Sequence, residues 1–234
     1  MKEADELLDD LTDWALGEGG EDGSDGAVIS GPNVHQADYE LSQIVLVPMD
    51  WDTGSLGLGA RYDVHDGQQR LVTVCLLLSA IRESFRSEGK GGEDTEGTVE
   101  ELTAMLNPPK VRKDPVLRIE LRKRDNEMLR RILVPELATG EDGAVGIDLP
   151  SSKNWASLSP TSRRILENYG RLSSRVSDLS AGERVALLDY LVERVYLLVC
   201  VPETGRIARN IVMAQGKGMD IEPIDDFKGL VCFR

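Results

Sequence analysis

The sequence predicts an α+β fold, in which helices cover a small sheet and the middle of the chain is helical. Alternating or β-branched runs predict short strands at residues 41–48, 60–65, 115–121 and 195–201. Apolar residues that recur every three or four positions predict helices before, between and after these strands. Strands and helices of both kinds in one chain, with several helices in succession, favour α+β over an all-helical fold.

In the first half of the chain, a helix is expected at residues 3–16, whose leucines fall on roughly one face. The run LSQIVLVP at 41–48 ends in proline and predicts a buried strand, and residues 60–65 predict its hairpin partner. From Gly67 to about Glu83 the helical pattern is apolar on most of its circumference, so this helix is expected to be well buried.

In the second half, Ser159 and Pro160 have the residue types of a helix N-cap and first helical position. Ser180 and Glu183 have the spacing of a capping box at the start of the next helix. Further helices are expected at 98–106, 125–133, about 204–214 and 224–234.

Glycine-rich polar segments at 17–38 and 86–98 are expected to be flexible insertions, and residues 139–154 to be a loop. With these insertions, residues 1–234 are expected to form a single domain.

The net charge of −14 is unevenly distributed. Residues 1–26 contain ten acidic residues and one lysine, a net charge of −9, and the remainder carries −5. A protein that binds nucleic acid with its whole surface should be basic, so this charge argues against such binding but leaves room for a local basic groove.

Cys75, Cys200 and Cys232 lie far apart in apolar runs, which favours buried thiols over a disulfide framework. With only two histidines, a Cys/His zinc site is not expected. No apolar run is long enough to span a membrane, and the acidic N-terminus does not resemble a signal peptide. We therefore expect a soluble protein, located in the cytoplasm or elsewhere inside the cell, without a membrane partner.

The five residues Asp66-Gly67-Gln68-Gln69-Arg70 stand where the expected second strand meets the apolar helix. A glycine lets the backbone bend sharply and approach a ligand closely, and the helix start offers unpaired N–H groups to an anion. Arg70 can hold phosphate oxygens, and the two glutamines carry donors and acceptors for a sugar, a base edge or water. Asp66 can hold a magnesium ion through water. The pattern predicts a phosphate-binding turn.

The same five residues also fit an ordinary helix start, in which Asp66 is the N-cap and Gly67 lies in the first turn. On spacing alone, this second interpretation is the commoner one.

The segments YELSQIVLVP and ARYDVHDGQQRLVTVCLLLSAIR resemble the family defined by the N-terminal domain of GmrSD-type restriction endonucleases. The likeness extends to ADELLDDLTDWAL, PVLRIELRKRDNEML and ARNIVMAQGKGMDIEPIDDFK, and so covers most of residues 4–228. The resemblance implies a fold like that of ParB and sulfiredoxin. It also implies a domain that binds and hydrolyses a nucleoside triphosphate with magnesium, in a bacterial defence protein directed against modified DNA.

The resemblance gives Asp66, Gln68, Gln69 and Arg70 a catalytic role, with Asp66 also at the metal, and places Gly67 in the nucleotide site. The segment ARNIVMAQGKGMDIEPIDDFK corresponds to the family's closing motif. From this closing motif the resemblance assigns five residues to nucleotide binding: Gln215, Lys217, Gly218, Asp225 and Lys228. The implied partners are a nucleotide and either DNA or a nuclease. The nuclease would be a domain or subunit outside this chain. The alternative is a non-catalytic module that senses a nucleotide or DNA, or a degenerate fragment.

Two features depart from the family pattern. The Tyr-Gln-Arg element that opens family members is missing, and Gln215 and Lys217 stand where the family has Asn and Arg. The chain is therefore expected to be truncated at both ends relative to the family.

Residues 110–131 hold nine basic and four acidic residues, the one basic concentration in the sequence. They predict either a surface that faces DNA or phosphate, or a solvated strand edge and helix whose charges pair locally. Asp50 and Asp52 are a candidate pair of carboxylate ligands for a cation. The segment AQGKGMD lacks the full spacing of a P-loop.

Overall fold

The computed structural model describes residues 2–16, 38–49, 61–87, 93–107, 117–134, 157–216 and 230–231. Contacts divide the chain into two compact units. A sheet unit comprises Ala37–Leu71 and Glu193–Arg234, and a helical unit comprises Met1–Gln36 and Val72–Val192. The expectation of a single domain over residues 1–234 stays a prediction.

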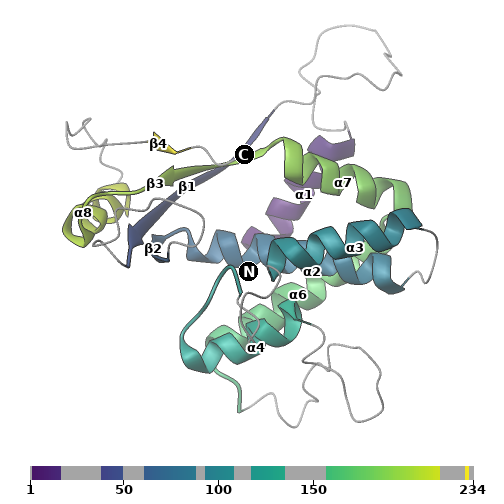
Figure 1. Cartoon of the computed structure of the whole chain (residues 1–234), viewed down its shortest axis with the longest axis horizontal. Helices are drawn as coiled ribbons and strands as arrows, with labels where there is room; N and C mark the ends of the chain where they lie inside the picture. The colour runs from purple at the N-terminus through teal and green to yellow at the C-terminus, as the bar shows by residue number, and fades with distance from the viewer. Residues whose placement is uncertain are drawn as a thin grey trace, which may run out of the picture. The chain divides into compact units, whose positions relative to one another are not determined.

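The sheet unit contains a small mixed sheet with the strand order β2-β1-β3-β4 (Figure 1). β1 pairs antiparallel with β2 and parallel with β3, and β3 pairs antiparallel with β4. The strands are β1 Tyr39–Pro48, β2 Tyr62–Asp66, β3 Val195–Cys200 and β4 Leu230–Val231. The α+β fold and the hairpin of the first two strands are thus confirmed.

Helix α8, Gly205–Gly216, packs against this sheet. Val45 and Val47 of β1 point to one face because side chains two apart on a strand share a face. There they meet Cys200 of β3 and Ala208 and Ile211 of α8, all of them buried. The strand and the helix expected near residues 195–214 are confirmed, and this small apolar core fixes α8 on the sheet.

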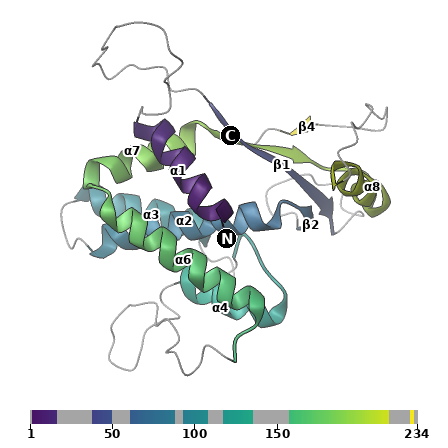
Figure 2. The same cartoon turned by 180° about the vertical axis from the view of Figure 1, so that it is seen from behind.

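The helical unit is built from six described helices, counting the larger part of α2 (Figures 1 and 2). Leucine and isoleucine side chains on α2, α4 and α6 are fully or almost fully buried, as their helical spacing predicts. The helices are α1 Lys2–Leu16, α2 Gln68–Ser87, α3 Glu93–Leu106, α4 Lys123–Leu133, α6 Pro160–Asp178 and α7 Ala181–Glu193.

The sequence signals for two helix starts are confirmed. The Ser159 hydroxyl accepts a hydrogen bond from the Ser162 N–H at 2.9 Å, with Pro160 as the first helical residue of α6. At α7, Glu183 accepts from the Ser180 N–H at 2.7 Å, while the Ser180 hydroxyl accepts from the Glu183 N–H at 3.3 Å. Hydrogen bonding of the Glu183 carboxylate with the side chain and the backbone N–H of Ser180 holds the pKa of Glu183 below its usual value.

A polar network ties α4 to α6. The hydroxyls of Ser159 and Ser162 both donate to the Asp125 carboxylate, the second at 3.0 Å. Both serines are buried, so the network satisfies polar groups that would otherwise be costly to remove from water. It also places the beginning of α4 beside the beginning of α6.

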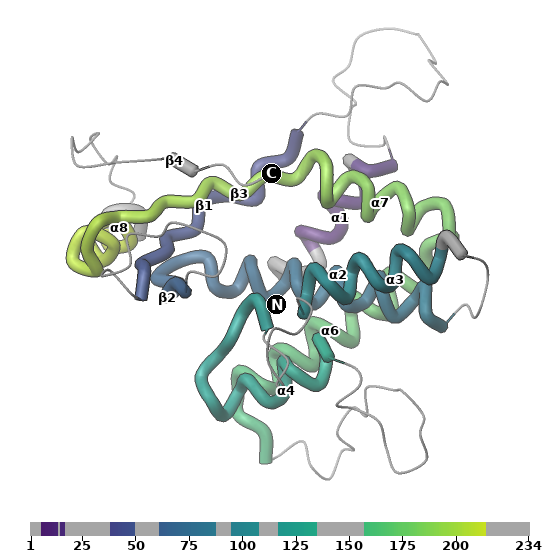
Figure 3. Tube along the Cα trace, in the orientation of Figure 1, coloured from purple at the N-terminus to yellow at the C-terminus, as the bar shows by residue number. Residues whose placement is uncertain are grey.

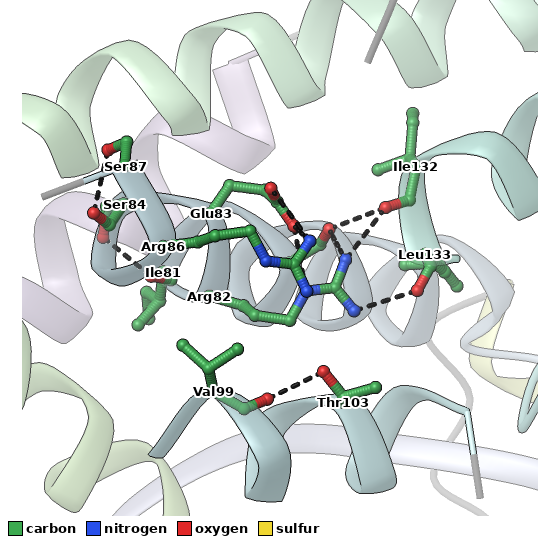
Figure 4. A network of polar contacts seen from close by, with 11 residues as sticks. Ile81, Arg82, Glu83, Ser84, Arg86, Ser87, Val99, Thr103, Ile132 and Leu133 are labelled. Carbon is green, nitrogen blue, oxygen red and sulfur yellow. Dashed lines mark hydrogen bonds and ion pairs between the residues drawn. The ribbon is translucent and has the colours of Figure 1, made fainter. Parts of the chain in front are cut away.

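Arg82 is one of the largest fully buried side chains among the described residues, and it serves as a cap for α4 (Figure 4). Its guanidinium donates to the Leu133 carbonyl at 3.0 Å and to the Ile132 carbonyl at 3.2 Å. It also pairs with Glu83 at 3.1 Å. Because the last carbonyls of a helix lack partners within the helix, this arginine satisfies two of them at the end of α4.

Tyr169 of α6 lies close to the same group. Burial and, to a smaller extent, the Glu83 carboxylate raise the pKa of Tyr169 to about 12, against the opposing effect of Arg82. The tyrosine therefore stays protonated at neutral pH and contributes a neutral hydroxyl to the packing of α6.

Three expectations about secondary structure were wrong. Residues 117–121 do not form a strand, although Leu117 and Ile119 are buried between exposed neighbours as in an alternating strand. The segment instead runs past the end of α3, where the Arg118 side chain donates to the Met105 carbonyl at 2.7 Å. The alternating sequence pattern predicted correctly that Leu117 and Ile119 are buried. The segment, however, forms its hydrogen bond with the end of a helix and not with a neighbouring strand.

The expected insertion at 86–98 is largely helical, since α2 continues to Ser87 and α3 begins at Glu93. Gly97 lies within α3 and does not interrupt the helix. A Cβ at this position would meet open space. At the other end, residues 230–231 form β4 and are not part of the expected final helix. The segments 17–37 and 139–154 lie outside the described residues.

Candidate functional site

The bend predicted between strand and helix lies at Gly67, directly after β2 and before α2 (Figure 3). Its φ of +84° is in the left-handed region that side chains disfavour. A Cβ at this position would lie 2.3 Å from Ile44 Cγ2 and 3.2 Å from Ile44 Cα. Backbone conformation and close contact with β1 therefore both require glycine here.

Helix α2 begins at the next residue. The Leu71 N–H donates to the Gly67 carbonyl at 3.1 Å, which makes Gly67 the N-cap residue in place of Asp66. The interpretation of Asp66 as an N-cap is therefore wrong. The N–H groups of Gln68, Gln69 and Arg70 lie in the first turn, where no carbonyl of the helix can accept from them.

Arg70 is held by β1. Its Nη1 donates to the Gln43 carbonyl at 2.7 Å and lies 3.7 Å from Asp66 Oδ2. The carbonyl is accessible because β2 ends at Asp66, which pairs with Val45, so Gln43 lies beyond the end of its neighbour. The Arg70 side chain is 40% exposed, and among the described residues its other guanidinium nitrogens have no partner.

Ser42, the residue before Gln43, has a φ of +85°, and the pairing of β1 with β3 shifts between Glu40 and Gln43. This irregularity is a bulge, which changes the direction of the groups that follow it. The Gln43 carbonyl that accepts from Arg70 thus belongs to an irregular part of β1.

Gln68 and Gln69 are exposed, and Asp66 is 36% exposed. The five predicted residues therefore form one junction, defined as residues 66–70, with a structurally required glycine, a fixed cation and two amide side chains that reach solvent. The junction has the donors to bind an anion and one carboxylate to balance a cation.

Most of the residues assigned from the closing motif lie outside the part of the chain that the structure describes. Gln215 is placed only as part of the last turn of α8, and the other four assigned residues lie outside the described ones. Asp50 and Asp52 also lie outside. His65, next to the junction, is exposed on β2.

Within the described ranges, no three Cys, His, Asp or Glu side chains form a metal-binding group. Asp66 is the one carboxylate of the junction. Mg²⁺ commonly binds through one or two carboxylates together with water and substrate phosphates, so Asp66 fits such an ion as a single ligand.

The described cysteines are not candidates for catalysis. Cys75 is half-buried, and burial raises the pKa of its thiol to about 12. Burial also raises the pKa of Cys200, while a hydrogen bond with the Gln43 side chain lowers it. Thiols that stay protonated are poor nucleophiles at neutral pH.

Sequence reasoning missed Gln43 and Ile44, which position Arg70 and Gly67. Gln43 is 27 residues from Arg70, and its contribution is a main-chain carbonyl, so no residue type could have indicated it. The expectation of a hairpin between the first two strands was the one available signal that β1 lies beside the junction.

Comparisons of the chain with protein-family models, curated proteins and solved structures found no match. None of the described helices has the length and apolar character needed to cross a membrane.

Proposed function

We propose that residues 66–70 bind the phosphates of a nucleoside triphosphate, and that the chain hydrolyses it. The observation that carries this proposal is the anchoring of Arg70 by one nitrogen, while its side chain is 40% exposed and its other guanidinium nitrogens have no partner among the described residues. A preoriented guanidinium next to unpaired N–H groups suits phosphate oxygens.

In this proposal each residue has a distinct task. Arg70 and the first-turn N–H groups hold the phosphates, and Gly67 lets the main chain approach them. Gln68 and Gln69 orient a water molecule that attacks the terminal phosphorus, so that the bond to the leaving phosphate oxygen breaks. A nucleoside diphosphate and inorganic phosphate form, and the proton of the water passes to solvent. Asp66 would hold magnesium, which offsets phosphate charge when bound.

On the resemblance of the sequence, we propose further that the chain has a ParB- and sulfiredoxin-like sheet and belongs to an intracellular defence protein directed against modified DNA. In that setting nucleotide turnover would regulate a nuclease on another domain or subunit. The small mixed sheet and the strand–glycine–helix junction are compatible with this proposal.

One observation favours a second candidate, a binding module without turnover. Asp66 and Arg70 already form an ion pair with each other, which occupies the carboxylate that hydrolysis would use. In this candidate the junction senses a nucleotide and changes contacts with a partner.

Phosphate release by the purified chain distinguishes these candidates. We expect the double variant Gln68→Ala/Gln69→Ala to lower the rate at least about tenfold, since the loss of one positioned polar group typically costs more than that. The matched control is Asp63→Ala/His65→Ala, which removes two exposed side chains from β2. Nucleotide binding without phosphate release would support the sensing module, and absence of both would refute the site.

A further inference from the structure

Helices α4 and α6 begin side by side (Figure 2), and five cationic residues lie at or near these two helix starts. Because Asp125 contacts both Ser159 and Ser162, the residues that flank these contacts are close neighbours. We call this group the basic end; it consists of Arg122, Lys123, Arg124, Arg163 and Arg164.

The first three of these side chains are unpaired. Arg122, Lys123 and Arg124 are exposed, and among the described residues none of them makes a hydrogen bond or an ion pair. Arg164 is exposed, and Arg163 donates only its Nε to the Leu158 carbonyl at 3.2 Å.

The acids on α4 offset this charge only in part, and neither of them pairs with a residue of the basic end. Asp125 accepts from the two buried serines, and Glu127 pairs with Arg131 at 2.7 Å, one turn further along α4. The expectation that the charges of residues 110–131 pair locally therefore holds for Arg131, and it fails for residues 122–124.

The position of the charges is itself unfavourable for folding. The N-terminus of a helix is its positive end, and cations there weaken the helix. Here three cations precede or begin α4, and Arg122 at its N-cap provides no capping bond. Residues that break a local rule without a structural gain are candidates for a function.

We propose that the basic end binds the phosphodiester backbone of nucleic acid, a site separate from the junction at residues 66–70. The basic end is the complement of a polyanion, in a chain whose net charge is otherwise strongly negative. This inference does not depend on nucleotide binding at the junction.

Nucleic acid fits this surface better than a membrane or an acidic protein. Stable contacts with a protein or a membrane usually add exposed apolar or aromatic anchors to the charges. Within the described part of the chain, the large apolar side chains that are exposed lie outside α4 and α6; they are Met49, Met105, Val185, Val192 and Met213.

The contacts should be to phosphates and largely independent of base sequence. Base edges are read by arginine, asparagine and glutamine side chains that enter a groove. The Oδ1 of Asn126 accepts from the Leu121 N–H at 3.0 Å, so this amide is not free for the bidentate contact that reads adenine. Cations that contact only the backbone position a protein on the duplex without selecting a sequence.

The test is the salt dependence of binding to a short DNA duplex, measured by fluorescence anisotropy with the full chain. The logarithm of the binding constant should fall linearly with the logarithm of salt concentration. Each phosphate contact contributes about 0.9 to the slope. We expect Lys123→Ala/Arg124→Ala to reduce the slope by about 2 and to weaken binding at low salt.

The matched control is Arg206→Ala/Arg209→Ala, which removes the same charge from exposed positions of α8 and should leave the slope unchanged. The swap Lys123→Arg/Arg124→Lys should keep the affinity, and thermal melting should show that all variants are folded. Gln68→Ala/Gln69→Ala should bind the duplex as the wild type does. No binding by the wild type at about 50 mM salt, or an equal loss in both alanine pairs, would overturn the proposal.

Discussion

Replacing Arg82 by alanine is expected to lower the free energy of unfolding by about 3–5 kcal/mol, the range for breaking a buried charged network. The side chain is fully buried, and its loss would leave the Leu133 carbonyl without its donor and the Ile132 carbonyl with the Ser79 hydroxyl alone. Each buried carbonyl left unpaired costs about 1–3 kcal/mol, and a cavity adds to this. Urea denaturation followed by circular dichroism measures the change.

Arg86, one turn further along α2, is the matched control for Arg82. It is 30% exposed and pairs with Glu83 at 3.2 Å, so Arg86→Ala should cost less than about 1 kcal/mol. The variant Arg82→Met keeps much of the volume but not the donors, and should recover only part of the stability. Equal effects of Arg82→Ala and Arg86→Ala would contradict the role of Arg82 as the cap of α4.

Replacing Gly67 by alanine is expected to cost about 2–5 kcal/mol, combining left-handed backbone strain of about 1–2 kcal/mol with overpacking of about 1–3 kcal/mol. The added methyl group would meet Ile44 Cγ2 at 2.3 Å, and the strand cannot yield without moving its backbone, since Ile44 Cα lies only 3.2 Å away. Chemical denaturation of the variant gives the cost directly.

Gly170 provides the opposite control, because it lies within α6 with open space where a Cβ would be. Gly170→Ala should raise the free energy of unfolding by about 0.5–1 kcal/mol, since alanine is the better helix former. If Gly67→Ala were as stable as the wild type, β1 would not lie against the junction as described.

The sequence was informative where the signal is local. The N-cap at Ser159, the capping box at Ser180 and the bend at Gly67 each depend on residues within four positions of one another, and each is present. Periodicity likewise located the long apolar helix α2 and the hairpin strands.

The sequence was misleading where a distant partner decides the structure. The alternation at Leu117 and Ile119 is compatible with a strand, but the segment finds its hydrogen bonds at the end of α3. Arg82 reads as an ordinary charged residue of an apolar helix, and only the fold shows that the carbonyls of α4 are within its reach. The anchoring of Arg70 by Gln43 is of the same kind.

The central claim, that the first turn of α2 receives phosphate, is tested most directly by following backbone amide resonances while a magnesium nucleoside triphosphate is added. The claim predicts that the largest shifts occur at Gln68, Gln69 and Arg70, with small shifts at Asp63 on β2. Unchanged amides at 68–70, with shifts at residues 122–124 instead, would contradict it and assign the phosphate to the basic end.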